Sequence, residues 1–258
     1  QPLRLAADLR PPMNGPTLTV LIPFHNEEPN VAPLVEELRG VIEGPAFGGH
    51  AGGPFTCEVL LVDDGSTDGT GAALAAAAAA WPVVRVERFP LNRGQAAALW
   101  WGFRNARGAW IATLDGDGQN PPAELARLWA ARESADMICG IRAHRRDPWL
   151  RRGMSRVANL ARRALLRDGV SDTGCSLKLL RREVTGAFLP IRTLYSFLPA
   201  FAAAAGWRVA EMPVEHRPRR AGKSKYGLRV MALHPLLDLL ALTWILRRTL
   251  GRPREDRT

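Results

Sequence analysis

The chain has 258 residues, of which 47% are hydrophobic, so it can bury a sizeable core and form one catalytic-size domain, with or without an appendage. Its formal charge of +10 is unevenly distributed: residues 1–138 carry 10 Lys and Arg against 16 Asp and Glu, whereas residues 139–258 carry 25 against 9. The three cysteines show neither Cys-x-x-Cys nor Cys/His spacing, which argues against a disulfide framework and a zinc site and favours a reducing compartment.

The difference between the halves, −6 against +16, predicts a polyanionic partner for the second half. Nucleic acid, anionic lipid and phosphorylated substrate are the candidates, and an Arg-rich chain from a GC-rich genome is the plain alternative. Nucleic acid is disfavoured, because its binding proteins usually combine basic clusters with aromatic stacking surfaces or a recognisable helix motif. Residues 1–16, QPLRLAADLRPPMNGP, lack the apolar core of a signal peptide, which predicts an N-terminal extension on a cytoplasmic protein.

Short β-branched runs alternate with helical patterns through the first half of the chain. This alternation predicts an α/β fold with a mostly parallel sheet covered by helices on both faces. The expected strands are residues 17–23, 57–66, 83–89 and 109–118, and the expected helices are residues 30–42, 69–81, 94–106 and 122–134.

Polar clusters follow three of these strands at their carboxyl ends. The clusters are His25 to Glu28, Asp63 to Asp68 and Asp115 to Asn120. Because ligands of such sheets bind beyond the carboxyl ends of the strands, we expect one site assembled from three loops.

The second half contains two segments suited to an interface. Residues 150–167, LRRGMSRVANLARRALLR, form a basic amphipathic helix pattern, which fits either a membrane surface or packing against the domain. Residues 230–246, VMALHPLLDLLALTWIL, are strongly apolar but contain Asp238 near their middle and are short for a bilayer span. With arginines on both sides, this segment is expected to lie on a membrane and not to cross it.

Asp115 and Asp117 are the strongest chemical signal in the sequence. Residues two apart on a strand point the same way, so both carboxylates can face one divalent cation. Mg²⁺ usually takes one or two protein carboxylates and fills its other positions with water and substrate phosphates. Alone, Asp-x-Asp is a weak motif, because a turn or an N-cap before the helix at Pro121 would produce it as well.

Other motifs accompany Asp115 and Asp117 in the sequence. IPFHNEE, VDDGSTDGT, NRGQAAALWWGF and LDGDGQNPP, in this order, resemble the family 2 inverting glycosyltransferases of the GT-A fold. GIRAHRRDPWLRRGMSRVANL, DTGCSLKLLRREV and GWRVAEMPVEHRPRRAGKSKYG resemble its polyprenyl-phosphate branch, which includes dolichyl-phosphate mannosyltransferases and undecaprenyl-phosphate sugar transferases. The resemblance covers residues 17–248. It implies a GT-A catalytic domain at 17–228 with a Rossmann-like nucleotide-binding half, and an interfacial helix and tail at 229–258.

The resemblance also implies roles for individual residues. Those expected to border the nucleotide-sugar are Pro23, Glu27, Asp63 or Asp64, Arg93, Gln95 and Asp115. Those expected to hold Mg²⁺ or Mn²⁺ and the diphosphate are Asp115, Asp117 and Gln119. Catalytic roles are expected for Asp117, for the loop arginines Arg142, Arg145 and Arg146, and for Lys223. The acceptor phosphate is expected to meet Ser155, Asn159, Arg220 and Lys225.

The acceptor decides the mechanism. A sugar hydroxyl must lose a proton before it attacks, so a transferase that uses one needs a general base. A lipid phosphate is already anionic and can displace the nucleoside diphosphate from C1 with inversion, which leaves mainly electrostatic stabilisation to the protein. The expected partners are therefore a nucleotide-sugar donor, a polyprenyl-phosphate acceptor and an anionic membrane surface on the cytoplasmic side.

Alternatives stay open at this point. A family 2 enzyme acting on a hydroxyl acceptor would need a base, for which Asp172 is a candidate, and a catalytically idle relative would serve as a membrane scaffold. Gly118 stands where many relatives have Leu, so the preferred sugar and nucleotide base are not readable. A homo-oligomer or a membrane-protein partner is equally open.

Overall fold

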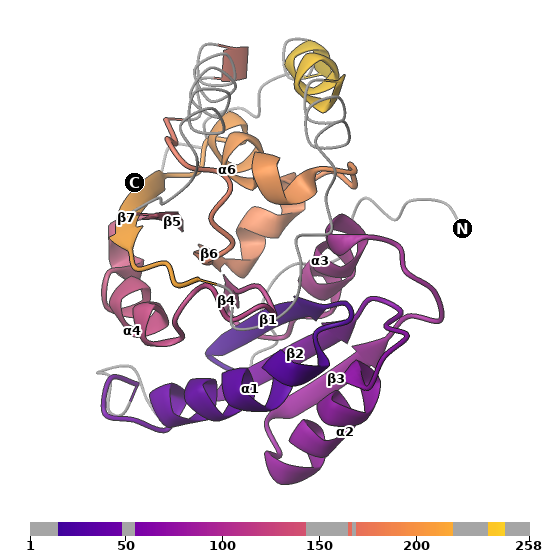
Figure 1. Cartoon of the computed structure of the whole chain (residues 1–258). Helices are drawn as coiled ribbons and strands as arrows, with labels where there is room; N and C mark the ends of the chain where they lie inside the picture. Colours follow the sequence, from indigo (N-terminus) through magenta and orange to yellow (C-terminus); the bar gives the residue numbers. More distant parts are fainter. Residues whose placement is uncertain (1–14, 48–54, 143–164, 167–168, 219–236, 246–258) are drawn as a thin grey trace.

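The computed structural model describes residues 15–47, 55–142, 165–166, 169–218 and 237–245 (Figure 1). Its strands are β1 (Leu18–Phe24), β2 (Cys57–Asp63), β3 (Val84–Arg88), β4 (Trp110–Thr113), β5 (Met137–Arg142), β6 (Lys178–Arg181) and β7 (Val209–Val214). Its α-helices are α1 (Glu28–Ile42), α2 (Thr70–Ala80), α3 (Gln95–Asn105), α4 (Ala123–Ala130) and α6 (Leu194–Ala204), with 3₁₀ turns η1 (Arg132–Ser134) and η2 (Arg182–Ala187). Residues 237–245 are also helical.

The strands form one sheet in the order β3-β2-β1-β4-β6-β5-β7. Neighbours pair in parallel except at β6, which runs antiparallel to both β4 and β5. The predicted mostly parallel α/β sheet is confirmed, and each of the eight expected strands and helices of the first half is present.

Helices cover both faces of the sheet, as Figure 1 shows. Helices α1, α2 and α4 pack on one face, and α3 and α6 pack on the other. Every residue of β1 is buried, which explains its continuous apolar sequence LTVLIPF. The two hydrophobic layers hold the strand ends in place, so the loops that follow them are presented on a rigid frame.

A difference in strand length opens the sheet at its carboxyl edge. The pairing of β1 with β2 continues to Phe24 opposite Asp63, but its pairing with β4 stops at Leu21 opposite Thr113. Beyond Leu21, therefore, β1 faces a gap on the β4 side. Pro23 lies in this stretch, where its missing N–H costs no hydrogen bond to β4.

The helix at residues 237–245 packs in the hydrophobic layer that contains α6. Leu239 and Leu242 belong to the same hydrophobic cluster as α6. Asp238 accepts hydrogen bonds from the backbone N–H of Thr193 (3.1 Å) and from its hydroxyl (2.5 Å). The rest of the expected interfacial segment 230–246, and all but two residues of the amphipathic segment 150–167, lie outside the described residues. None of the helices in the described ranges has the length and apolar character needed to cross a bilayer.

Candidate functional site

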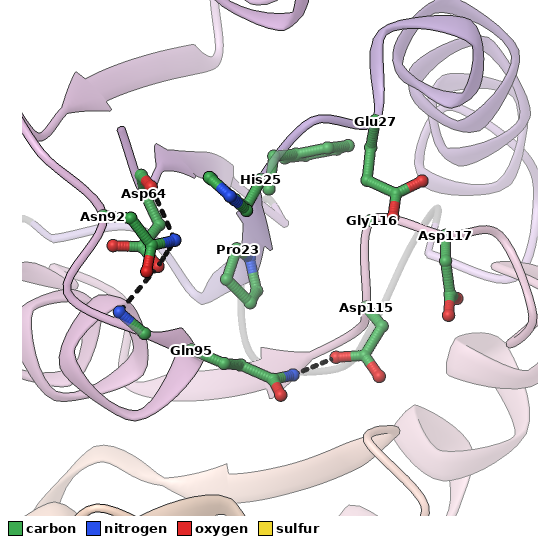
Figure 2. Close-up of a pocket in the computed structure, with 11 residues that line it drawn as sticks. Pro23, His25, Glu27, Asp64, Asn92, Gln95, Asp115, Gly116 and Asp117 are labelled. Atoms are coloured by element: carbon green, nitrogen blue, oxygen red, sulfur yellow. Dashed lines mark hydrogen bonds between the residues drawn. The ribbon is translucent and has the colours of Figure 1, made fainter. Parts of the chain in front are cut away.

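A pocket of about 350 Å³ occupies the gap at the carboxyl edge of the sheet (Figure 2). It is built from the loops after β1, β2 and β4 and from the beginning of α3. The lining residues are Pro23, Phe24, His25, Glu27, Asp64, Asn92, Gly94, Gln95, Asp115, Gly116 and Asp117. The three polar clusters expected from the sequence therefore meet in one site.

The loop after β1 is tied to the loop after β2. Asn26 has a φ of +51°, the left-handed region that Asn tolerates better than most residues. Its Oδ1 accepts a hydrogen bond from the Thr67 backbone N–H (2.8 Å), and its own N–H donates to the Ser66 hydroxyl (3.0 Å). Glu27, which is buried, accepts from the Asn30 side-chain amide at 2.6 Å. These contacts set the position of Glu27 on the pocket wall.

Asp63 and Asp64 point in different directions. Asp63 is fully buried away from the pocket, where it accepts from the Ser66 N–H (2.8 Å) and pairs with the Arg88 guanidinium (3.2 Å). Asp64 lines the pocket. Of the two residues that the sequence left open for the nucleotide, the structure thus brings Asp64 to the site.

Asp64 organises the loop that leads into α3. Its carboxylate accepts hydrogen bonds from the backbone N–H of Arg93 (2.7 Å) and Gly94 (2.9 Å) and from the Asn92 side chain (3.0 Å). Gly94, with a φ of +89°, is the N-cap of α3, so Asp64 holds the helix start against the pocket. Burial raises the pKa of Asp64 despite these hydrogen bonds.

Asp115 and Asp117 follow β4 and both line the pocket (Figure 2). The Gln95 side chain donates to Asp115 Oδ1 at 2.6 Å, and the Gln119 backbone N–H donates to Asp117 Oδ1 at 3.0 Å. Gly116 lies between them against Phe24, where a Cβ would come within 2.5 Å of the aromatic ring. A glycine is therefore required for the close approach that brings both carboxylates to one cavity.

The sequence profile described as Glycosyl transferase family 2 matches residues 19–188, which include all these loops. The chain belongs to glycosyl transferase family 2. It is 37% identical over 231 residues to the undecaprenyl-phosphate 4-deoxy-4-formamido-L-arabinose transferase of Edwardsiella ictaluri, over 88% of this chain and 68% of the relative. It is 33% identical over 253 residues to the dodecaprenyl-phosphate galacturonate synthase of Rhizobium johnstonii, over 96% of this chain and 71% of the relative.

Solved structures of other glycosyltransferases share the fold. A Pyrobaculum calidifontis mannosyltransferase in complex with GDP-Man and Mn²⁺ superposes with a TM-score of 0.63 at 22% identity, over 98% of this chain and 70% of that one. Glucosyl-3-phosphoglycerate synthase of Mycobacterium tuberculosis, with Mg²⁺ and UDP, gives 0.65 at 19% identity, over 90% and 79%. The expected GT-A fold and the resemblance to the polyprenyl-phosphate branch of family 2 are confirmed.

Two residues expected at the site, Gln119 and Arg93, have their side chains engaged elsewhere. The Gln119 side-chain amide donates to the Arg217 carbonyl (3.3 Å), and the backbone carbonyl of Gln119 accepts from the Arg217 N–H (2.8 Å). The Arg93 guanidinium lies over the Phe89 ring, 5.9 Å from the ring centroid. The backbone N–H of Arg93 donates a hydrogen bond to Asp64. The expected roles of the Arg93 guanidinium at the nucleotide-sugar and of the Gln119 amide at the metal thus stay predictions.

Arg142 forms a bidentate ion pair with Asp172. Its Nε lies 2.8 Å from Asp172 Oδ2, and its Nη2 lies 2.8 Å from Oδ1. Both side chains are largely buried, and a Cβ at Gly174 would come within 2.7 Å of the guanidinium. The pair joins the end of β5 to the segment before β6.

Asn92 and Gly94 line the pocket, although the sequence interpretation passed over them. Their signal is the Asn-x-Gly step directly before α3, where a glycine with positive φ begins a helix. The remaining expected residues lie outside the described residues and stay predictions; they are Arg145, Arg146, Ser155, Asn159, Arg220, Lys223 and Lys225.

Proposed function

We propose that this family 2 enzyme transfers a sugar from a nucleoside-diphosphate sugar to the phosphate of a polyprenyl lipid, with inversion at the anomeric carbon, on the cytoplasmic face of a membrane. The observation that carries the proposal is the pocket that unites Asp64, Asp115 and Asp117. The named activities of the undecaprenyl- and dodecaprenyl-phosphate relatives support the choice of acceptor.

The pocket has features suited to a nucleoside diphosphate. Its wall includes Gly94 and Gln95 at the beginning of α3, where the dipole of the helix favours an anion. Pro23 offers an apolar surface, and Asp64 and Asn92 offer polar groups for a ribose or a base. A cavity of about 350 Å³ is of the size that small-molecule ligands occupy.

The donor set at Asp115 and Asp117 fits Mg²⁺ or Mn²⁺. The described ranges contain no group of three or more His, Cys, Asp and Glu arranged as a metal cage. Mg²⁺ does not need one, because two carboxylates together with substrate phosphates and water satisfy it. When bound, the ion would stabilise the negative charge on the leaving diphosphate. Gln95 and the Gln119 N–H hold the two carboxylates in position for it.

The ion pair of Asp172 favours a phosphate acceptor over a hydroxyl acceptor. Asp172 was the candidate base for a hydroxyl, but its two oxygens accept both arms of the Arg142 guanidinium. A carboxylate held on both oxygens by a guanidinium is committed to that ion pair and is poorly placed to take the proton of a hydroxyl. A phosphate monoester needs no base, since its oxygen attacks C1 directly while the C1–O bond to the diphosphate breaks.

The exposed face of helix 237–245 supports attachment to a membrane. Leu237, Leu240 and Trp244, spaced on one helical face, are 53%, 56% and 63% exposed. The opposite face packs on the domain, so this apolar row can enter the headgroup region without unfolding the helix. The charge of +16 in residues 139–258 would attract anionic lipids to the same half of the chain.

The deciding experiment is mass spectrometry of liposomes that contain undecaprenyl phosphate, after incubation with the protein, Mg²⁺ and a mixture of UDP- and GDP-sugars. We expect the lipid to gain the mass of one sugar, with release of the nucleoside diphosphate. Nucleoside diphosphate released without any change of the lipid would contradict a phosphate acceptor and favour a hydroxyl. No reaction with any donor would favour an idle relative.

A further inference from the structure

A buried lysine lies beside the pocket and takes no part in the mechanism described so far. Lys178, the first residue of β6, is only 2% exposed. It stands opposite Thr113 in the antiparallel pairing of β6 with β4, and Thr113 lies two residues before Asp115. Its Nζ donates a hydrogen bond to the Cys175 carbonyl. The ammonium thus lies at the carboxyl edge of β4, where the pocket begins.

Lys178 shares a second cavity with the residues of the donor pocket. This cavity, of about 10 Å³, is lined by Lys178, Gln95, Asp115 and Tyr195, among others. Gln95 and Asp115 also line the larger pocket. Gln95 and Asp115 therefore lie between the donor pocket and the smaller cavity that Lys178 lines.

The charge of Lys178 needs a counter-charge. Among the residues that the structure describes, no carboxylate lies within ion-pair distance of its Nζ, and a carbonyl is its hydrogen-bond partner. A buried ammonium is costly unless an anion or several hydrogen bonds compensate it. An anionic substrate at Asp115 would supply that compensation during the reaction.

The position of Lys178 indicates which anion this is. The second cavity opens beneath α6, whose Tyr195 and Leu198 line it. The start of α6 is joined to helix 237–245 through Thr193 and Asp238, and Figure 1 shows α6 between the sheet and that helix. Because the exposed apolar row lies on helix 237–245, a lipid phosphate that comes from the membrane reaches Asp115 from the side of Lys178.

We propose that Lys178 binds a phosphate oxygen of the prenyl-phosphate acceptor beside Asp115. This inference rests on the proposed function. The second cavity is too small for a phosphate, so the ammonium turns on its four-carbon stem from Cys175 towards the donor pocket. There it offsets the repulsion between the acceptor, the diphosphate and the carboxylates while the acceptor oxygen bonds to C1 and the diphosphate leaves.

The test is steady-state kinetics with farnesyl phosphate as a short-chain acceptor and with the donor found for the wild type. Lys178→Gln should raise the KM for farnesyl phosphate roughly ten- to a hundredfold, the range expected for loss of one charged hydrogen bond. The KM for the donor should stay within about twofold, a change too small to reflect a lost contact. Lys178→Arg, which restores the charge, should recover most of the acceptor affinity.

The matched control is Arg181→Gln on the same strand. Arg181 stands at the other end of β6, opposite Trp110, and pairs with Glu133 and Asp136. Its substitution removes the same charge without changing either KM. If the melting temperature of Lys178→Gln falls, Lys178→Met replaces it, because Met keeps the apolar stem.

Two outcomes would overturn the inference. An unchanged KM for farnesyl phosphate in a folded Lys178 variant would make the lysine structural. A rise confined to the donor KM would show that the ammonium serves the donor diphosphate. If instead the wild type fails to glycosylate any prenyl phosphate, the proposed function itself fails, which these variants do not decide.

Discussion

Buried carboxylates occur at both ends of the central sheet, but their partners differ. At the amino ends of the strands, Glu58 on β2 pairs with Arg85 at 2.9 Å, and Asp136 before β5 pairs with Arg208 at 3.4 Å. At the carboxyl ends, the partners described for Asp64, Asp115 and Asp117 are amide groups of the backbone and of Asn and Gln side chains.

We expect this difference to separate carboxylates that stabilise the fold from those that bind the ligands of the proposed function. A guanidinium neutralises a carboxylate permanently, so the pair ties segments together and leaves little charge for a ligand. An amide orients a carboxylate by a hydrogen bond without adding a positive charge beside it. The contrast therefore lies between carboxylates on the pocket wall, which amide groups orient towards a ligand, and carboxylates paired with arginine, which include Glu58 and Asp136 at the amino ends and Asp63 at the carboxyl end of β2.

The largest expected effect is at Asp117. Asp117→Asn removes one of the two negative charges that we propose for the metal and should lower turnover at least about a hundredfold, because metal stabilisation of the leaving diphosphate supplies several kcal/mol. Mn²⁺ affinity, measured by electron paramagnetic resonance, should fall with it. Asp136→Asn, the same change at the other end of the sheet, is the control and should keep full turnover. Full turnover in Asp117→Asn, or activity that survives EDTA, would show that Asp117 is no more functional than the carboxylates paired with arginine.

At the amino end, Glu58→Gln should reduce stability and leave turnover unchanged. The substitution leaves Arg85 without its carboxylate and weakens the hydrogen bond from the Thr19 hydroxyl, which is 2.7 Å from Glu58 Oε2. Loss of one partner of such a buried pair should lower the free energy of unfolding by about 3 kcal/mol in urea denaturation. Glu43→Gln, which breaks an exposed pair with Arg39 at 3.1 Å, should cost less than about 0.5 kcal/mol. Equal losses in the two variants would contradict the structural role of Glu58.

Asp64→Asn should raise the KM for the nucleotide-sugar about tenfold, since it disturbs hydrogen bonds worth about 1–2 kcal/mol. Asn has a single acceptor oxygen, so it cannot receive the N–H groups of Arg93 and Gly94 on separate oxygens as the carboxylate does. Asp68→Asn, in the same loop but not on the pocket wall, is the control. An unchanged donor KM in Asp64→Asn would mean that the loop before α3 holds its shape without this carboxylate.

The smallest expected effect is the pH dependence of Asp136→Asn. Burial by itself raises the pKa of Asp136, but the hydrogen bonds and charge of Arg208 and the charge of Arg181 outweigh it, so its pKa lies below the ordinary value. A carboxyl with a lowered folded-state pKa stabilises the protein above its unfolded pKa, and this contribution is lost as the pH falls through the folded value. The variant should therefore be less stable than the wild type by about 1 kcal/mol at pH 7, and the difference should shrink below about pH 4. A difference that persists at pH 2 would rule out the charge as its cause.

The sequence predicted the fold and the meeting of three loop clusters at one pocket, but not how single side chains are used. The alternation of strands and helices and the clusters after β1, β2 and β4 were visible because they depend on neighbouring residues. The pairing of Arg142 with Asp172 was not, because it joins residues 30 positions apart in the chain. From the sequence, Arg142 was expected to be catalytic and Asp172 was a candidate base. In the structure, the two side chains form an ion pair with each other.

What the amino-acid sequence determined by itself is the parallel sheet, its helical cover and the presence of Asp115 and Asp117 at one strand end, since periodicity and local spacing encode these. The tertiary structure decided which way each group points. Asp63 and Asp64 alternate across the strand, and only the position of Arg88 and of the α3 start shows which one reaches the pocket. Likewise, Lys178 lies beside Asp115 only because β6 runs back along β4. Such contacts arise from strand order and register, which link distant segments and leave no trace in any local pattern.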